Sequence, residues 1–169
     1  TKTLIRAGVP NVVNPFDRRA VTEAVRLKQR YGAEVIVLTM GPPQAREALV
    51  ECLAMGADRA VHLVDRAFAG ADTLATAHTL AAAARRIGFD LILCGKYSVD
   101  AETGQVGPEL AELLDLPHVS GVCRLELAPD LRHLQAERET DEGFEVVAAP
   151  LPALLTAAER LNRPIKVDA

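Results

Sequence analysis

One segment of the chain, residues 91–107 with the sequence LILCGKYSVDAETGQVG, constrains the fold more than any other. It begins with a short apolar run, residues 91–94, which is typical of a strand buried on both faces in a parallel sheet. A polar, glycine-containing loop follows, and an amphipathic helix then runs to about Leu114. Free N–H groups and the dipole at the start of a helix attract phosphate, and glycine lets a phosphate approach the backbone. The segment therefore predicts a phosphate or nucleotide site at the carboxyl edge of an α/β sheet.

This loop pattern is of moderate specificity, because it contains neither GxGxxG nor GxxxxGK followed by Ser or Thr. On the pattern alone, an ordinary strand-to-helix connection with turn residues is an equally good interpretation. Ser98 and Ser120 have no His and Asp arrangement that would make either of them a catalytic nucleophile.

The first two-thirds of the chain predicts helices and strands in alternation. Apolar residues at helical spacing, each run ended by a glycine, predict helices over about 17–31, 45–55 and 73–87. Asp17 would lie at the N-cap or in the first turn of the first helix, and Asp72 or Thr73 would cap the third. Apolar, β-branched runs predict parallel strands at 34–40, which would be central in the sheet, and at 59–64.

Beyond Pro117 the pattern changes to strands joined by tight turns, and then to a short strand that returns to the main sheet. The predicted strands cover residues 119–127, 131–139, 144–149 and 154–156. Arg138 and Glu145 would form a structural cross-strand pair. The sequence has no internal repeats and no low-complexity linker, so we predict one α/β domain over residues 1–169. It would have a doubly wound, mostly parallel, Rossmann-like sheet and an antiparallel addition near the C-terminus.

A doubly wound sheet normally begins with a strand that leads into its first helix. Residues 1–13 are short and irregular here, with a weak strand signal only at Leu4 and Ile5. The chain also begins with Thr1 rather than Met. We therefore expect the first strand of the sheet to be absent from this chain.

The charge and the apolar pattern exclude several classes of function. The net charge is −4 and no basic run exceeds two residues, so no nucleic-acid partner is expected. No apolar run approaches membrane-spanning length and no signal peptide is present, so we expect no direct membrane insertion. The three cysteines lie far apart in apolar surroundings, which is typical of buried, reduced thiols in a cytoplasmic protein. The four histidines lie in separate segments and predict no metal site.

Three stretches together resemble one known family, the β subunit of electron transfer flavoproteins. The first is NPFD at 14–17, which opens a helix ending in RLK, and the second is LAMGADRA at 53–60. The third and most specific is AERETDEGFEVV at 136–147, which continues to PALLT at 152–156. It has the family's basic residue, acidic-Gly turn, Glu and P-x-apolar-apolar-T ending. The resemblance continues through residues 160–164 and covers nearly the whole chain.

The resemblance implies an αβ heterodimer of the bacterial cytoplasm that carries electrons. Its partners would be the electron transfer flavoprotein α subunit and an acyl-CoA-type or other dehydrogenase. In this family the α subunit holds most of one FAD. The β subunit carries an adenine nucleotide, which is AMP in the common branch and a second FAD in the electron-bifurcating branch. Because the flavin performs the redox chemistry, we expect an electron-transfer subunit rather than an enzyme.

The loop at 100–108, DAETGQVGP, indicates which nucleotide the β subunit carries. The AMP branch tends to show D-x-x-x-N-Q-T-G. The bifurcating and nitrogen-fixation branch shows a D-x-x-T-x-Q-V-G-P form. Gly104 and Val106 stand where the AMP branch has Asn and Thr. We therefore expect FAD in this subunit, with AMP as the alternative.

The resemblance also implies which residues form the nucleotide site. Backbone N–H groups near residues 103–107 and the Thr103 hydroxyl would bind phosphates, while Asp100 and Gln105 would hold the loop or contact the ribose. The segments 14–17 and 40–41 would line the adenosine side, with core packing as the alternative role of Met40. Lys96 would pair with a phosphate or be solvated. The expected nucleotide-binding residues are Asn14, Pro15, Phe16, Asp17, Met40, Gly41, Gly95, Lys96, Asp100, Thr103, Gly104, Gln105, Val106 and Gly107.

Two parts of the family pattern are missing from this sequence. One is the first strand, which supplies part of the adenine pocket in the family. The other is the long segment after Pro164, which docks the dehydrogenase and embraces the α subunit. We therefore expect a domain that is incomplete at both ends.

Two other functions stay open at this point. An adenine-nucleotide-hydrolysing or adenylating enzyme on the same scaffold would usually carry an SGGxDS-like loop after its first strand, and none is present. A purely structural module would use bound AMP only to stabilise the fold. Flavin absorbance would favour the electron carrier over the structural module, and phosphate release from ATP would favour the enzyme.

Overall fold

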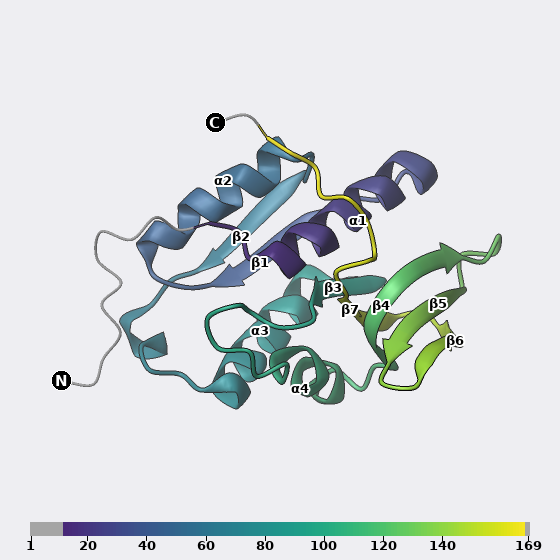
Figure 1. Cartoon of the computed structure of the whole chain (residues 1–169). Helices are drawn as coiled ribbons and strands as arrows, with labels where there is room; N and C mark the ends of the chain where they lie inside the picture. Colours follow the sequence, from purple (N-terminus) through teal and green to yellow (C-terminus); the bar gives the residue numbers. More distant parts are fainter. Residues whose placement is uncertain (1–11, 168–169) are drawn as a thin grey trace.

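A computed structural model describes residues 12–167, so the weak strand signal at Leu4 and Ile5 lies outside the described residues. Figure 1 shows helices and strands in alternation, followed by a twisted antiparallel extension. The helices are α1 (Pro15–Tyr31), α2 (Arg46–Ala54), α3 (Thr73–Ile87) and α4 (Val106–Leu113), with short 3-10 turns at Pro43–Ala45 and Arg66–Phe68. The strands are β1 (Ile36–Met40), β2 (Arg59–Leu63), β3 (Leu91–Gly95), β4 (His118–Leu127), β5 (His133–Thr140), β6 (Gly143–Pro150) and β7 (Ala153–Ala157).

Local chemistry sets the ends of the helices. Helix α1 begins after Asn14 with Pro15 in its first turn, and it ends at Gly32, which has a left-handed φ of 71°. Asp17 therefore lies in the first turn rather than at the N-cap. The carboxylate of Asp72 accepts a hydrogen bond from the Ala75 N–H at 2.8 Å and caps α3. Of the two predicted caps, Asp72 and Thr73, the first is therefore the one that the structure shows. None of the helices between residues 12 and 167 is long and apolar enough to cross a membrane.

The strands form a mixed sheet in the order β3-β7-β4-β5-β6 and a separate parallel pair, β1-β2. Strand β7 is parallel to both β3 and β4, and β5 is antiparallel to both β4 and β6. The α/β prediction is therefore confirmed, including the antiparallel addition and the return of residues 154–156 to the main sheet. The predicted pair of Arg138 and Glu145 is also confirmed, with Nε and Oε2 3.2 Å apart on neighbouring strands.

One prediction about an individual strand is wrong for the described residues, and another holds only in part. Strand β1 was predicted to be central, but within residues 12–167 it pairs only with β2. Strand β3 was predicted to be buried on both faces, and helices do pack on both of its faces, but all five of its residues are only partly buried. The reason is that β3 pairs along one edge, with β7, while its other edge has no partner among the described residues. The fully buried strand is β7, which has a neighbour on each side.

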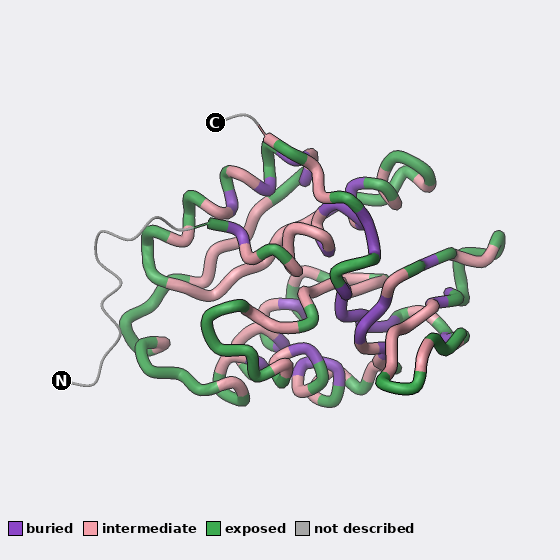
Figure 2. The backbone as a smooth tube through the Cα atoms, viewed as in Figure 1, coloured by how far each residue is buried: buried purple, intermediate pink, exposed green. Residues whose placement is uncertain are grey.

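Helices cover both faces of the β3-β7 pair. Alternate residues of a strand point to opposite faces, and here Leu93 and Leu155 pack in one cluster with Ala20 of α1. Ile92 and Leu154 pack in a second cluster with residues of α3 and α4. Figure 2 shows the buried residues gathered along β7 and the first half of β4, while the loop after β3 is largely exposed. The core therefore holds β7 and the start of β4 in place, while the loop that follows β3 lies at the surface.

Candidate functional site

The loop between β3 and α4, residues 96–105, starts from a fixed point on the sheet. The Lys96 N–H donates to the Ala157 carbonyl at 3.1 Å, which continues the β3-β7 ladder by one residue. The Glu102 N–H then closes a turn by donating to the Ser98 carbonyl at 2.8 Å. Glu102 and Gly104 have left-handed φ values of 53° and 63°. At Gly104 this conformation costs little because the residue has no Cβ.

Helix α4 opens at the end of this loop with backbone donors available. Its N-cap residue, Gln105, makes no side-chain capping bond, and the N–H groups of Val106 and Gly107 have no acceptor one turn earlier in the helix. Such a helix start favours an anion. Gly107 itself is buried against the sheet, where a Cβ would lie 2.7 Å from Cγ2 of Thr156 and 3.2 Å from Sγ of Cys94. Gly107 therefore lets α4 pack closely on the sheet, as a glycine does in dinucleotide-binding motifs.

The predicted residues at the start of α1 also lie at this edge, against the end of β3. The Gly95 N–H donates to Oδ1 of Asp17 at 2.7 Å. A Cβ on Gly95 would lie only 2.8 Å from the Asp17 backbone nitrogen and from Cβ of Phe16. The ring of Phe16 meets that of Tyr97, with centroids 4.5 Å apart. The structure thus brings residues 14–17 together with the β3–α4 loop.

Burial dominates the electrostatics of this edge. It raises the pKa of the Asp17 carboxyl, while the Gly95 N–H and the Asn14 side chain oppose that rise. Burial, with a smaller contribution from the Asp17 charge, raises the pKa of the Cys94 thiol to about 12. Cys94 is therefore a neutral thiol and a poor nucleophile at neutral pH. By solvent exposure Cys94 and Cys123 are half-buried and Cys52 is buried, so the expectation of fully buried cysteines is confirmed only for Cys52.

Sequence reasoning missed a contact between the starts of α3 and α4. The Thr73 hydroxyl lies 3.1 Å from both Oε1 of Gln105 and Oε1 of Glu109. A hydroxyl has one hydrogen, so it donates to one of these oxygens at a time. The sequence offered Thr73 only as a helix cap, and Asp72 takes that role. The structure instead shows Thr73 tying Gln105, a predicted site residue, to a neighbouring helix.

Other predicted site residues lie apart from this cluster of contacts. Met40 and Gly41 are at the end of β1, where the Gly41 N–H donates to the Leu63 carbonyl at 3.1 Å. Within residues 12–167, no hydrogen bond joins these two residues to the β3–α4 loop. The side chains of Lys96 and Asp100 are exposed on the loop. They are free to meet a ligand or to remain solvated.

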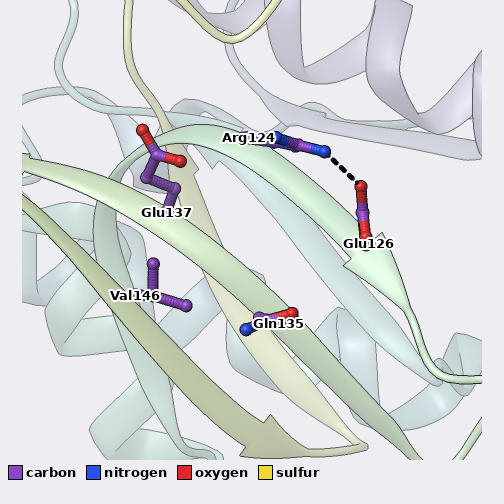
Figure 3. A pocket seen from close by; sticks show the side chains of 5 residues that line it. All are labelled: Arg124, Glu126, Gln135, Glu137 and Val146. Carbon is purple, nitrogen blue, oxygen red and sulfur yellow. Dashed lines mark hydrogen bonds and ion pairs between the residues drawn. The ribbon is translucent and has the colours of Figure 1, made fainter.

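The hollow shown in Figure 3 is not part of this edge. It lies on the antiparallel strands and is lined by Arg124, Glu126, Gln135, Glu137 and Val146. Arg124 and Glu126 pair across part of it, with Nη2 and Oε1 2.7 Å apart. The described part of the chain contains no group of His, Cys, Asp and Glu side chains arranged to hold a metal ion. The edge at β3 and α4 therefore remains the candidate site.

The family profile and the relatives that match this chain agree with one another. The sequence profile of a family described as "Electron transfer flavoprotein domain" matches residues 1–169. The chain is 52% identical over 162 residues to "Electron transfer flavoprotein subunit beta" of Clostridium acetobutylicum, which covers 96% of this chain and 62% of that protein. It is 45% identical over 170 residues to "Protein FixA" of Azorhizobium caulinodans, covering 96% of this chain and 60% of that protein.

A third relative is named as part of a complex. The chain is 46% identical over 166 residues to "Caffeyl-CoA reductase-Etf complex subunit CarD" of Acetobacterium woodii, covering 97% of this chain and 63% of that protein. The chain thus spans about three-fifths of the length of these curated relatives.

Proposed function

Because this chain belongs to the electron transfer flavoprotein family, among β subunits that include FixA, we propose that it binds an adenine nucleotide and pairs with a flavin-bearing α subunit. In that complex it would carry electrons between an acyl-CoA-type or other dehydrogenase and an acceptor. It would not catalyse a reaction by itself. The name of the related subunit CarD, which places that protein in a reductase–Etf complex, supports the pairing with other subunits.

The observation that carries the nucleotide proposal is the open start of α4 beside the end of β3. The N–H groups of Val106 and Gly107 would bind a phosphate, and the exposed Lys96 side chain lies on the loop that leads to them. The Thr103 hydroxyl would accompany these donors, and Asp100 and Gln105 would order the loop or meet the ribose. The adenosine would lie toward residues 14–17 and toward Met40 and Gly41 at the end of β1.

We propose FAD rather than AMP as the nucleotide of this subunit. The support is the loop at 100–108, in which Gly104 and Val106 replace the Asn and Thr of the AMP-type pattern. Bound FAD would supply the redox chemistry, while the protein would bind and orient it.

The proposed compartment is the bacterial cytoplasm, and the proposed domain is a single one over residues 1–169. The cysteines support the compartment, since Cys52, Cys94 and Cys123 are all free thiols. The match of one family profile to the whole chain supports the single domain.

The test is to co-express the full-length subunit with its α subunit, purify the complex, denature it and identify the released nucleotides by chromatography. Two FAD per heterodimer are expected. One FAD with one AMP would overturn the preference for FAD and keep the site. A folded complex that releases no nucleotide from this subunit would overturn the site itself.

A further inference from the structure

The side chains of Asn14 and Asp17 use their polar atoms on the protein itself. Asn14 Nδ2 donates to Oδ2 of Asp17 at 2.8 Å and to the Tyr97 carbonyl at 2.9 Å. Asn14 Oδ1 accepts the Val99 N–H at 3.2 Å. The other Asp17 oxygen accepts the Gly95 N–H at 2.7 Å. Both amide hydrogens of Asn14 and both oxygens of Asp17 therefore have partners before any ligand arrives.

These contacts hold the end of β3 and the first part of the β3–α4 loop at three alternate positions. Residues 95, 97 and 99 are each bound through a backbone N–H or carbonyl group. The approach is too close for a side chain on Gly95, and the Phe16 and Tyr97 rings pack beside it. The turn at Ser98 and Glu102, which leads toward residues 103–107, follows directly. The start of α1 thus determines the path on which the loop leaves β3.

We infer that Asn14 and Asp17 are positioning residues for the nucleotide site, rather than residues whose side chains contact the nucleotide. They form a clasp, defined as the Asn14 and Asp17 side chains with their bonds to residues 95, 97 and 99. The clasp keeps the loop in the conformation that presents the start of α4. This inference rests on the proposed nucleotide site.

Two consequences distinguish a positioning role from direct contact. If the clasp sets the fraction of molecules with the loop in its binding conformation, the apparent Kd of the nucleotide rises by the factor by which that fraction falls. The loosening of the loop is then visible without ligand, as faster amide hydrogen exchange. A side chain that also contacted the nucleotide directly would raise the Kd by more than the fall in that fraction accounts for.

The experiment uses the full-length subunit in complex with its α subunit, after removal of the nucleotide of this subunit. The variants are Asn14→Ala and Asp17→Asn, and Gln29→Ala, on the exposed side of the same helix, is the matched control. Hydrogen exchange reports on the Gly95 and Val99 amides, whose acceptors belong to the clasp. The Lys96 amide, which is bound to the Ala157 carbonyl, is an internal reference. FAD and AMP are each titrated calorimetrically.

In the Asn14→Ala complex we expect exchange at Val99 to become about tenfold faster, since the exchange-protecting bond is lost, with little change at Lys96. The Kd for the nucleotide that the native complex binds should also rise. The factor should match the fall in the fraction of molecules whose loop is in its binding conformation. Asp17→Asn should act the same way at Gly95, because its single amide oxygen cannot accept both the Gly95 N–H and the Asn14 amide, and its NH2 group meets a donor in either orientation. The double variant should lose little more than either single one, because both act through one clasp.

Two results would overturn the clasp: a higher Kd with unchanged exchange in the free complex, or faster exchange with an unchanged Kd. The first would make the two residues direct ligands, and the second would make them structural only. Failure of the native complex to bind FAD or AMP would instead refute the proposed function. In that case the exchange measurement still shows whether the clasp orders the loop.

Discussion

The parallel and antiparallel parts of this molecule carry different kinds of contact. Around β3, β7 and α4, backbones approach so closely that Gly95 and Gly107 have no room for a Cβ, and Leu155 is only 1% exposed. On β6, by contrast, Phe144 and Val146 are 56% and 62% exposed. The side-chain ion pair there, between Arg138 and Glu145, is partly exposed. The hollow in Figure 3 belongs to this second part, so a hollow alone does not locate the candidate site.

The difference follows from how the strands are connected. Parallel strands end at the same edge of the sheet, so their loops and the helix starts that follow converge there. Antiparallel strands joined by tight turns bring no helix start to their ends. A nucleotide-binding edge is therefore expected beside β3 and not on the β5-β6 hairpin.

The largest expected effect on stability contrasts a buried residue of the parallel part with an exposed residue of the antiparallel part. Leu155→Ala should destabilise the protein by about 3 kcal/mol, because it leaves a cavity in the core between the sheet and α1. Val146→Ala, on the exposed face of β6, should change the free energy of unfolding by less than about 0.5 kcal/mol. Urea unfolding of the full-length subunit in its complex measures both. Equal losses would contradict the burial contrast.

The second effect tests the close approach at the end of β3. Gly95→Ala should cost about 2 kcal/mol, since its Cβ would meet the backbone nitrogen of Asp17, which cannot move aside as a flexible side chain could. The same change should also weaken nucleotide binding. Thermal unfolding and nucleotide retention on gel filtration provide the two readouts. A variant with native stability would show that α1 and β3 do not approach so closely.

A smaller effect should come from the tie between α3 and α4. Thr73→Val keeps the shape of the side chain and removes the hydroxyl that lies beside Gln105 and Glu109, so it should cost about 1 kcal/mol. Thr79→Val is the matched control, because its hydroxyl donates only to the Ala75 carbonyl within the same helix. Denaturant unfolding of both variants checks the difference. If Thr79→Val costs as much, the contact between the helices adds nothing.

The smallest effect is expected at the cross-strand pair of the hairpin. Arg138 and Glu145 are partly exposed, so Arg138→Ala should change stability by no more than about 0.5 kcal/mol. Raising the salt concentration should reduce even that difference, because exposed charges are screened. Unfolding at low and high salt measures it. A loss of several kcal/mol in the free energy of unfolding would contradict this prediction. It would show that polar contacts stabilise the antiparallel part strongly.

Most of the features predicted correctly are those whose partners lie a few residues away. Gly32 ends α1 because its left-handed φ of 71° suits glycine, and Asp72 caps α3 through the N–H of Ala75. The hairpin turns and the pairing of Arg138 with Glu145 follow from a short connection and a two-residue period. The strand-loop-helix pattern of residues 91–107 led to the β3–α4 loop, and the family resemblance led to residues 14–17. It did not reveal what the side chains in that segment do.

The sequence by itself therefore determined the order and type of the elements, and where most of them begin and end, because hydrogen bonding and steric limits act over a few residues. The tertiary structure decided that β7 lies between β3 and β4, and that Thr73 reaches α4. It also decided that Asp17 binds Gly95, 78 residues further along the chain. Such contacts depend on how the core packs elements that are distant in sequence, and no local pattern encodes that distance.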